Sequence, residues 1–514
     1  MIFKNKLSGL LNCADQIGAF VDKCGLTRWI FERSNLAFFY GIFLFLYEIS
    51  FLRHLIPVVH PFLIAWALFI IVYDIVIRRI WATIPKKVIL GLFVVSAALT
   101  SILNLEAGMV SNVKAFVMTI IPIFTFYPIC VSKNRIYKQK IFIKSTLGAS
   151  LVCFVTSAVA LVLFFMNISR QIVFHNDPMT LGYRYYIPED PSSGMLLYGV
   201  NEDTNHSAAY ALVFIAISLI TFICCKKGLF EKNWVNRVLK IYSVANIVAQ
   251  ICYFPLANSR GAWLALLVSL SVVLLLYLYF TKLRHLPTKS RVIKSTALTL
   301  TAVIIVSVGI LGVRTVVSGT ANIITSISNN ISSNDADNPE QNGTTPNKKP
   351  SQGNLPVIDS FEKNDEYMGG GRLYIWQDAF SLVEKMPIFG NGPGNNEYFA
   401  KKYDVAEYTL AKGKHVHNSY LDLLLNYGAV GFLIMMVFLI LCAKDVLVKI
   451  FTDGKNRDAS YYLVTFSVLI VAITSFFLSS VFINTTAVSF IMFISLGYLV
   501  SEKQIKSDKI VLEA

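Results

Sequence analysis

A short polar stretch that leads into an apolar run holds the residues best suited to chemistry. His415 and His417 stand two positions apart, and Asn418 directly follows the second of them. A titratable side chain at a membrane boundary costs free energy and usually serves a function. Histidine suits proton transfer because its unperturbed pKa lies near the working pH. The alternative is that both histidines merely lie at the interface as amphipathic residues.

Two arginines are candidate partners of the histidine pair. Arg260 lies between two apolar runs, and Arg372 begins a segment with helical periodicity. A planar guanidinium binds phosphate through two parallel hydrogen bonds, so these arginines and histidines together suit an anionic substrate. Either arginine could instead be structural, Arg260 by reaching the lipid headgroups and Arg372 as a solvated residue at a helix start.

Further polar residues lie near this stretch in sequence. Asn418 and Asp422 are four positions apart, a spacing at which helical side chains meet, so they could orient one another. Residues 390–394 read Gly-Asn-Gly-Pro-Gly, but they lack the Gly-Lys-Ser/Thr ending of a phosphate-binding loop. We interpret this run as a tight turn after a helix.

The composition places these residues in a membrane protein. Of the 514 residues, 55% are hydrophobic and only 15% are charged, whereas soluble globular proteins carry about 25% charged residues. Apolar runs long enough to span a bilayer, about 20 residues each, recur twelve times. We place them near 35–52, 55–76, 88–105, 112–131, 146–167, 207–225, 239–257, 261–281, 295–317, 418–442, 459–479 and 481–500. The predicted fold class is an all-α polytopic membrane protein with about 12 transmembrane helices.

Lysines and arginines gather in every second connection between these runs, beginning with the one between the second and third. Cytoplasmic loops of membrane proteins carry this excess of basic residues. Both termini are therefore predicted to be cytoplasmic. The net charge of +15 is then a signal of topology, and we predict no nucleic-acid partner.

The apolar runs divide the chain into membrane and peripheral parts. Residues 1–34 are interpreted as a cytoplasmic amphipathic segment, and 501–514 as a cytoplasmic tail. The first nine helices occupy 35–317, with an outer loop at 168–206, and the last three occupy 418–500.

A large extracytoplasmic loop, 318–417, separates the ninth helix from the tenth. Within it, 328–356 has the Asn-, Ser- and Pro-rich composition of a disordered linker, and 369–417 is predicted to be structured. In the earlier outer loop, Tyr183 to Tyr186 could stack on sugar rings, although an interfacial aromatic belt is the preferred interpretation.

Three stretches in this order resemble the O-antigen ligase and polymerase superfamily of bacterial envelopes. They are Ser259-Arg-Gly-Ala-Trp-Leu-Ala-Leu266, then Gly371-Arg-Leu-Tyr-Ile-Trp376 with Pro387-Ile-Phe-Gly-Asn-Gly-Pro-Gly394, and His415-Val-His-Asn-Ser-Tyr-Leu421. The resemblance covers roughly residues 200–450, and the spacing from His417 to Gly428 is similar to one described for these polymerases. Val416 stands where the family often has Pro.

The resemblance implies an inverting, metal-independent glycosyl transfer without a cofactor, on the outer leaflet of the bacterial cytoplasmic membrane. The donor would be a glycan on undecaprenyl pyrophosphate. Arg260 and Arg372 would hold the pyrophosphate. His417, with His415 as second choice, would be the general base on the acceptor hydroxyl. The implied partners are an acceptor glycan or lipid and a chain-length regulator.

Several interpretations of the function stay open. A polymerase that extends a second lipid-linked repeat is the first choice, and an O-antigen ligase acting on lipid A core or a protein O-glycosylating relative is an alternative. A different class is a transporter or flippase of lipid-linked oligosaccharide. Transporters carry internal repeats and polar residues near mid-membrane, and neither is evident in this sequence. A non-catalytic scaffold would explain neither the histidine pair nor Arg260.

Overall fold

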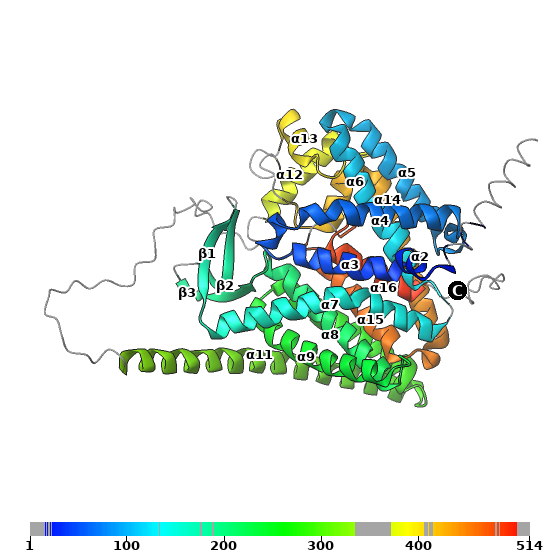
Figure 1. Ribbon diagram of the computed structural model, residues 1–514. Coiled ribbons are helices and arrows are strands. Elements are labelled where there is room, and N and C mark those ends of the chain that lie inside the picture. Colours follow the sequence, from blue (N-terminus) through cyan, green and yellow to red (C-terminus); the bar gives the residue numbers. More distant parts are fainter. Residues whose placement is uncertain are drawn as a thin grey trace, which may run out of the picture.

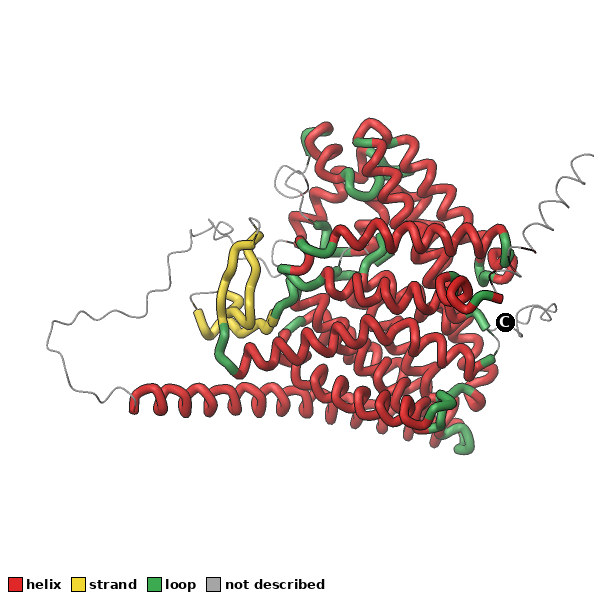
Figure 2. Tube along the Cα trace, viewed as in Figure 1, coloured by secondary structure: helices red, strands yellow, loops and turns green. Residues whose placement is uncertain are grey.

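The computed structural model describes residues 23–334, 372–405 and 415–500, except 133, 175–176, 188–189, 479–480 and 483, together with residues 16, 18, 21 and 410. The helices form an antiparallel bundle, and a small sheet covers part of one end (Figures 1 and 2). The predicted tail and most of the predicted N-terminal amphipathic segment lie outside the described residues.

Each of the twelve predicted apolar runs coincides with a helix. These helices are α3 (Arg33–Tyr47), α4 (His60–Val76), α5 (Lys87–Leu103), α6 (Met109–Ile121), α7 (Arg135–Phe165), α8 (Thr204–Lys226), α9 (Asn233–Ala257), α10 (Arg260–Tyr277), α11 (Thr288–Asn334), α14 (Ser419–Asp453), α15 (Ala459–Thr474) and α16 (Ala487–Val500). Among the described residues, eight helical stretches are long and apolar enough to cross a membrane, and α5, α15 and α16 are shorter apolar helices. The prediction of a helical polytopic membrane protein is confirmed.

Three shorter helices complete the helical part. The first, α2 (Gly25–Ile30), precedes α3, and α12 (Arg372–Lys385) and α13 (Asn396–Lys402) belong to the segment before α14. A second, smaller apolar core forms around α12 and α13, and it includes Leu382, Phe399 and Val416. This core places the start of α12 beside the residues that precede α14.

The short helix α16 lies at the centre of the bundle. Every residue from Ala487 to Val500 is buried. It packs against α3, α7, α14 and α15 and against the turns that follow α6. A helix that is apolar all round is suited to such a position.

The segment predicted as an outer loop at 168–206 contains a sheet that the all-α prediction leaves out. Strands β1 (Ser169–Phe174), β2 (Asp177–Ile187) and β3 (Asp190–Gly199) pair antiparallel in the order β1-β2-β3. On β2, Tyr183 Oη donates a hydrogen bond to Asn167 Oδ1 at 2.5 Å. The Arg184 guanidinium lies 4.8 Å from the centroid of the Tyr198 ring. The belt and sugar-stacking interpretations of this segment stay predictions.

Helix α11 is longer than predicted. It continues from the apolar run 295–317 to Asn334, and so includes the first residues of the predicted linker 328–356. Figure 1 shows α11 running beside α9 and then extending beyond the bundle. The rest of that linker lies outside the described residues.

Successive helices run in opposite directions, so their connections divide between two ends of the bundle. We call the end at which α8, α10 and α14 begin the site end. The sheet, α12 and α13 lie at the site end, as Figure 1 shows. The short connections rich in Lys and Arg lie at the opposite end.

Polar caps fix where the helices of the site end begin. Asp203 Oδ1 accepts a hydrogen bond from the Asn205 amide at 2.6 Å at the start of α8. Ser259 Oγ accepts one from the Ala262 amide at 3.3 Å at the start of α10. Ser259 Oγ also donates to Asn205 Oδ1 at 2.8 Å. The two helix starts are thus joined, which positions the residue after Ser259, Arg260.

Candidate active site

The turn before α14 holds the predicted histidine pair. His417 has a left-handed backbone, with φ of 51°. Asn418 caps α14, because its Oδ1 accepts hydrogen bonds from the Tyr420 and Leu421 amides at 3.1 and 3.2 Å. The helix begins after His417, so neither histidine belongs to it. His415 is exposed, whereas His417 is half-buried.

Two segments distant in sequence hold this turn in place. The Ser419 amide donates to Ser475 O at 2.8 Å, and Ser419 Oγ donates to Leu478 O at 2.5 Å. Trp376 Nε1 of α12 donates to Val416 O at 3.1 Å. The histidine turn is therefore fixed between α12 and the loop that follows α15.

Arg260 shares a pocket with an arginine that sequence reasoning missed. Arg260 begins α10 and, with Trp263, Leu311 and Arg314, lines a pocket of about 310 Å³ between α10 and α11. Arg314 Nη1 donates a hydrogen bond to Asn258 Oδ1 at 3.2 Å. Within the part of the chain that the structure describes, neither arginine pairs with a carboxylate. Two guanidinium groups at one pocket suit an anion.

Arg372 lies close to the start of α10. Its guanidinium carbon is 5.7 Å from the centroid of the Phe477 ring. The same ring packs against Gly261, where an added Cβ would lie 2.9 Å from Phe477 Cδ2. The starts of α10 and α12 therefore meet at one aromatic ring, which contacts Arg372 and lies against Gly261, the residue after Arg260.

His417 lies within electrostatic reach of Arg372 and of the start of α8. Burial is the largest influence on its pKa and lowers it. Asp203 opposes this shift, whereas Arg372, His415 and His206 add to it. Because the net shift lowers the pKa from its ordinary value, the His417 imidazole is neutral at physiological pH.

The two residues predicted to orient one another have separate side-chain partners. The Asn418 side chain caps α14, and Asp422 Oδ1 accepts a hydrogen bond from Asn426 Nδ2 at 2.8 Å. The Asp422 amide donates to Asn418 O at 2.8 Å through the helix backbone. A direct orienting contact between the two side chains stays a prediction.

The glycine-rich loop after α12 closes onto a break in α14. At Gly428, φ of 60° and ψ of −170° interrupt the helix. The Asn391 amide donates to Leu425 O at 3.1 Å, and the Ala429 amide donates to Pro387 O at 2.8 Å. The loop thus satisfies backbone groups that the break would leave unpaired. This agrees with its interpretation as a structural turn.

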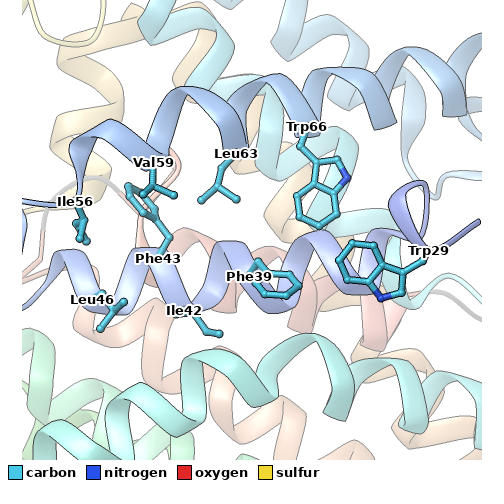
Figure 3. Close-up of a pocket in the computed structure, with 9 residues that line it drawn as sticks. All are labelled: Trp29, Phe39, Ile42, Phe43, Leu46, Ile56, Val59, Leu63 and Trp66. Atoms are coloured by element: carbon cyan, nitrogen blue, oxygen red, sulfur yellow. The ribbon is translucent and has the colours of Figure 1, made fainter. Parts of the chain in front are cut away.

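A second pocket, with an apolar lining, is formed by other residues. It occupies about 380 Å³ between α3 and α4, and its walls include Trp29, Phe43 and Trp66 (Figure 3). Its lining holds no ionisable side chain. The pocket therefore suits hydrocarbon and provides no group for proton transfer.

Sequence reasoning missed four residues at the site end: Glu48, His206, Arg314 and Phe477. Arg314 could have been found, since it is an arginine inside a predicted apolar run. His206 had a weaker signal, a histidine in the first turn before an apolar run. Glu48 had the same signal as Arg314, a charged residue inside the predicted apolar run 35–52. Phe477 had none, because its proximity to the site depends on packing between distant helices.

Fold and site together define a class of protein. It is a polytopic helical membrane protein in which arginines and histidines from several helix starts gather at one end of the bundle.

Residues 245–436 match the family described as O-antigen ligase. The match includes Arg260, Arg314, Arg372 and His417, and it confirms the resemblance predicted from the sequence. Over these residues the chain is similar to that family, and the similarity supports a membrane enzyme of surface polysaccharide biosynthesis.

A protein of Haemophilus influenzae, named only as an uncharacterized protein, is also similar. It is 26% identical over 232 residues, which are 44% of this chain and 48% of that protein. The chain therefore matches about half the length of this relative.

Proposed function

We propose that this protein transfers a glycan from undecaprenyl pyrophosphate to an acceptor hydroxyl, on the outer leaflet of the bacterial cytoplasmic membrane. The observation that carries the proposal is the gathering of Arg260, Arg314 and Arg372 at one end of the bundle without carboxylate partners among the described residues. Guanidinium groups bind pyrophosphate and stabilise the negative charge that grows on it as it leaves. The transfer inverts the anomeric centre and requires no metal.

An imidazole of the site end takes the proton of the acceptor hydroxyl. The sequence-based candidates are His417 first and His415 second. His417 is half-buried within electrostatic reach of Arg372, and its lowered pKa favours the neutral imidazole that proton acceptance requires. Asn418 supports it by fixing the turn at the start of α14.

The acceptor we favour is a second lipid-linked repeat, which makes the protein a polymerase of O-antigen, capsule or exopolysaccharide. A chain-length regulator is then an expected partner. Transfer to lipid A core would instead make it a ligase.

The test is transfer by the purified protein from a defined lipid-pyrophosphate donor, with a chelator present. We expect longer lipid-linked glycans from the wild type and none from Arg260→Ala. No transfer by the wild type, or transfer that depends on added divalent metal, would reject the proposal. Dependence on a lipid A core acceptor would identify a ligase.

The orientation of the protein in the membrane is tested separately. Ser351 lies in the predicted outer loop, and His285 lies in a basic connection at the opposite end. In a background with Cys24 replaced by Ser, Ser351→Cys should react with an impermeant thiol reagent on intact cells. His285→Cys should react only after permeabilisation. The reverse pattern would place the arginines on the cytoplasmic side.

A further inference from the structure

Asn258, at the turn between α9 and α10, connects the sheet to α11. Its backbone is left-handed, with φ of 53°, a conformation that asparagine adopts more readily than most residues. Its Oδ1 accepts a hydrogen bond from Arg314 Nη1 at 3.2 Å, and its Nδ2 donates one to Met195 O of β3 at 3.3 Å. A guanidinium only donates and a carbonyl only accepts, so these two partners fix the orientation of the amide.

Arg314 lies where a charged side chain needs a partner. It belongs to the predicted apolar run 295–317 and is half-buried, and an ionised group within a transmembrane segment is costly and usually serves a function. Among the described residues Asn258 accepts a hydrogen bond from it, and no carboxylate pairs with it. Because an amide is neutral, this contact holds the guanidinium in place and leaves its positive charge available.

The turn that holds Arg314 also carries Arg260. Ser259, between Asn258 and Arg260, caps α10 through the hydrogen bond from the Ala262 amide. Arg260 and Arg314 line the same pocket of about 310 Å³. The backbone of α10 places Arg260, and the side chain of Asn258 places Arg314, so this one turn sets the separation between the two guanidinium groups.

Two cations at a fixed separation suit an anion with two charged groups. Each guanidinium can donate a pair of hydrogen bonds to one phosphate. A diphosphate would engage both arginines, whereas a monophosphate would leave one of them in the pocket without an anion. Leu311, in the wall of this pocket, is exposed on α11, so a lipid chain can reach the pocket from the bilayer.

We propose that Asn258 is a positioning residue, which holds Arg314 at the separation from Arg260 at which each guanidinium binds one phosphate of a lipid diphosphate. The inference rests on the proposed function and adds the feature that makes the site select a diphosphate over a monophosphate. Asn258 acts through Arg314. The roles of Arg372 and His417 are unchanged.

The experiment measures the binding of undecaprenyl diphosphate and undecaprenyl monophosphate to the purified full-length protein in detergent, by thermophoresis. We expect the wild type to bind the diphosphate at least about 10-fold more tightly, which is the effect of one further hydrogen bond between charged groups. Arg314→Gln should remove most of this preference. Asn258→Gly retains the left-handed backbone and removes the amide, so it should reduce the preference about 3- to 10-fold. In transfer assays it should raise KM for the donor more than it lowers kcat.

A double-mutant cycle separates positioning from a general weakening of the fold. If Asn258 acts through Arg314, the variant with both Asn258→Gly and Arg314→Gln should bind the diphosphate no worse than Arg314→Gln alone. Asn167→Gly is the matched control. Asn167 is also left-handed, with φ of 54°, but its side chain accepts a hydrogen bond from Tyr183 of β2 instead of an arginine. This control should bind both lipids as the wild type does.

An unchanged lipid preference in Asn258→Gly would overturn the inference, and so would additive effects of the two substitutions. An equal loss of preference in Asn167→Gly would show that attachment of the sheet, and not the amide contact, determines affinity. If Asn258→Gly does not give a monodisperse protein, Asn258→Asp decides. Its carboxylate would neutralise Arg314, so diphosphate binding should fall about 10-fold, and unchanged binding would reject the role of Asn258.

The two proposals fail in different ways. A wild type that binds the diphosphate but transfers no glycan would reject the proposed function. A wild type that transfers glycan but shows no preference for the diphosphate would reject only the inference about Asn258 and Arg314.

Discussion

At the end of the bundle opposite the site, two cations are paired with largely buried carboxylates of other helices. Arg33 Nε lies 2.5 Å from Asp74 Oδ2, which joins α3 to α4. Lys86 Nζ lies 3.0 Å from Asp445 Oδ2, which joins the start of α5 to α14. These carboxylates are largely buried, so each pair holds two helices together and leaves little charge for a ligand.

The arginines at the site end differ in their partners. Arg53 pairs with Glu202 there, which shows that carboxylates are present at that end. Arg260, Arg314 and Arg372 nevertheless have no carboxylate partner among the described residues. The two ends therefore use similar side chains differently: arginine and lysine pair with carboxylates at one end, and at the other the three arginines stay available for the anion binding that we propose.

The largest effect on transfer is expected at Arg260. Arg260→Lys should lower kcat/KM about 10- to 100-fold, because an ammonium cannot replace two parallel guanidinium hydrogen bonds. Arg284→Lys, an exposed arginine at the opposite end, is the control and should match wild type. The measurement is in vitro transfer at equal protein levels. Wild-type activity in Arg260→Lys would show that Arg260 only reaches the headgroups.

Gly428→Ala should have the next largest effect. An added Cβ would lie 2.3 Å from Ile388 O, at a backbone φ of 60°. The strain should cost about 1–3 kcal/mol, loosen the loop that joins α12 to α14, and lower both the melting temperature and transfer. Gly312→Ala is the control, since nothing lies within 4 Å of its added Cβ. Equal melting temperatures for the two variants would contradict the closure of the loop onto the break.

A smaller effect is expected on the titration of His417. Burial lowers its pKa, and the positive charge of Arg372 contributes to the lowering. Arg372→Gln removes that charge, so the pKa of His417 should rise, and Asp203→Asn should move it the other way. NMR of labelled histidine in nanodiscs measures both shifts. If neither substitution changes the pKa of His417, then Arg372 and Asp203 do not influence this imidazole, and His417 does not lie near the arginines.

The smallest effect on transfer is expected from the opposite end. Asp445→Asn leaves Lys86 without its carboxylate, which should destabilise the protein by about 1–3 kcal/mol while the transfer rate of the folded protein stays unchanged. Thermal unfolding and transfer, measured on the same preparation, test this. A large loss of kcat without a loss of stability would show that the Lys86–Asp445 pair takes part in transfer, and the two ends would then not differ in function.

Much of the fold followed from the sequence because bilayer thickness dictates the length of apolar runs. Each predicted run coincides with a helix. The sheet was missed because its strands lie in a polar loop with no long apolar alternation, and the end of α11 was missed because helix formation there continues past the apolar run.

Only part of the candidate site could be predicted from the sequence, for a different reason. Arg260, Arg372 and His417 stand in local motifs, so the sequence alone names them. The approach of the start of α10 to Arg372 through Phe477 depends on how α10, α12 and the loop after α15 pack. Likewise, Glu48 is more than 150 positions from His206, and only the pairing of the residues after α3 with those before α8 brings them together.

The burial of α16 on every side has a consequence for biogenesis. A membrane protein leaves its ribosome from the N-terminus onward, so α3 and α7 enter the bilayer long before the helix that will separate them from α14 and α15. Until Ala487 to Val500 arrive, the earlier helices have an unfilled space at their centre. Ribosomes that stop before this segment should therefore yield inserted chains that cellular proteases recognise as incomplete, even though Arg260, Arg372 and His417 have already been made.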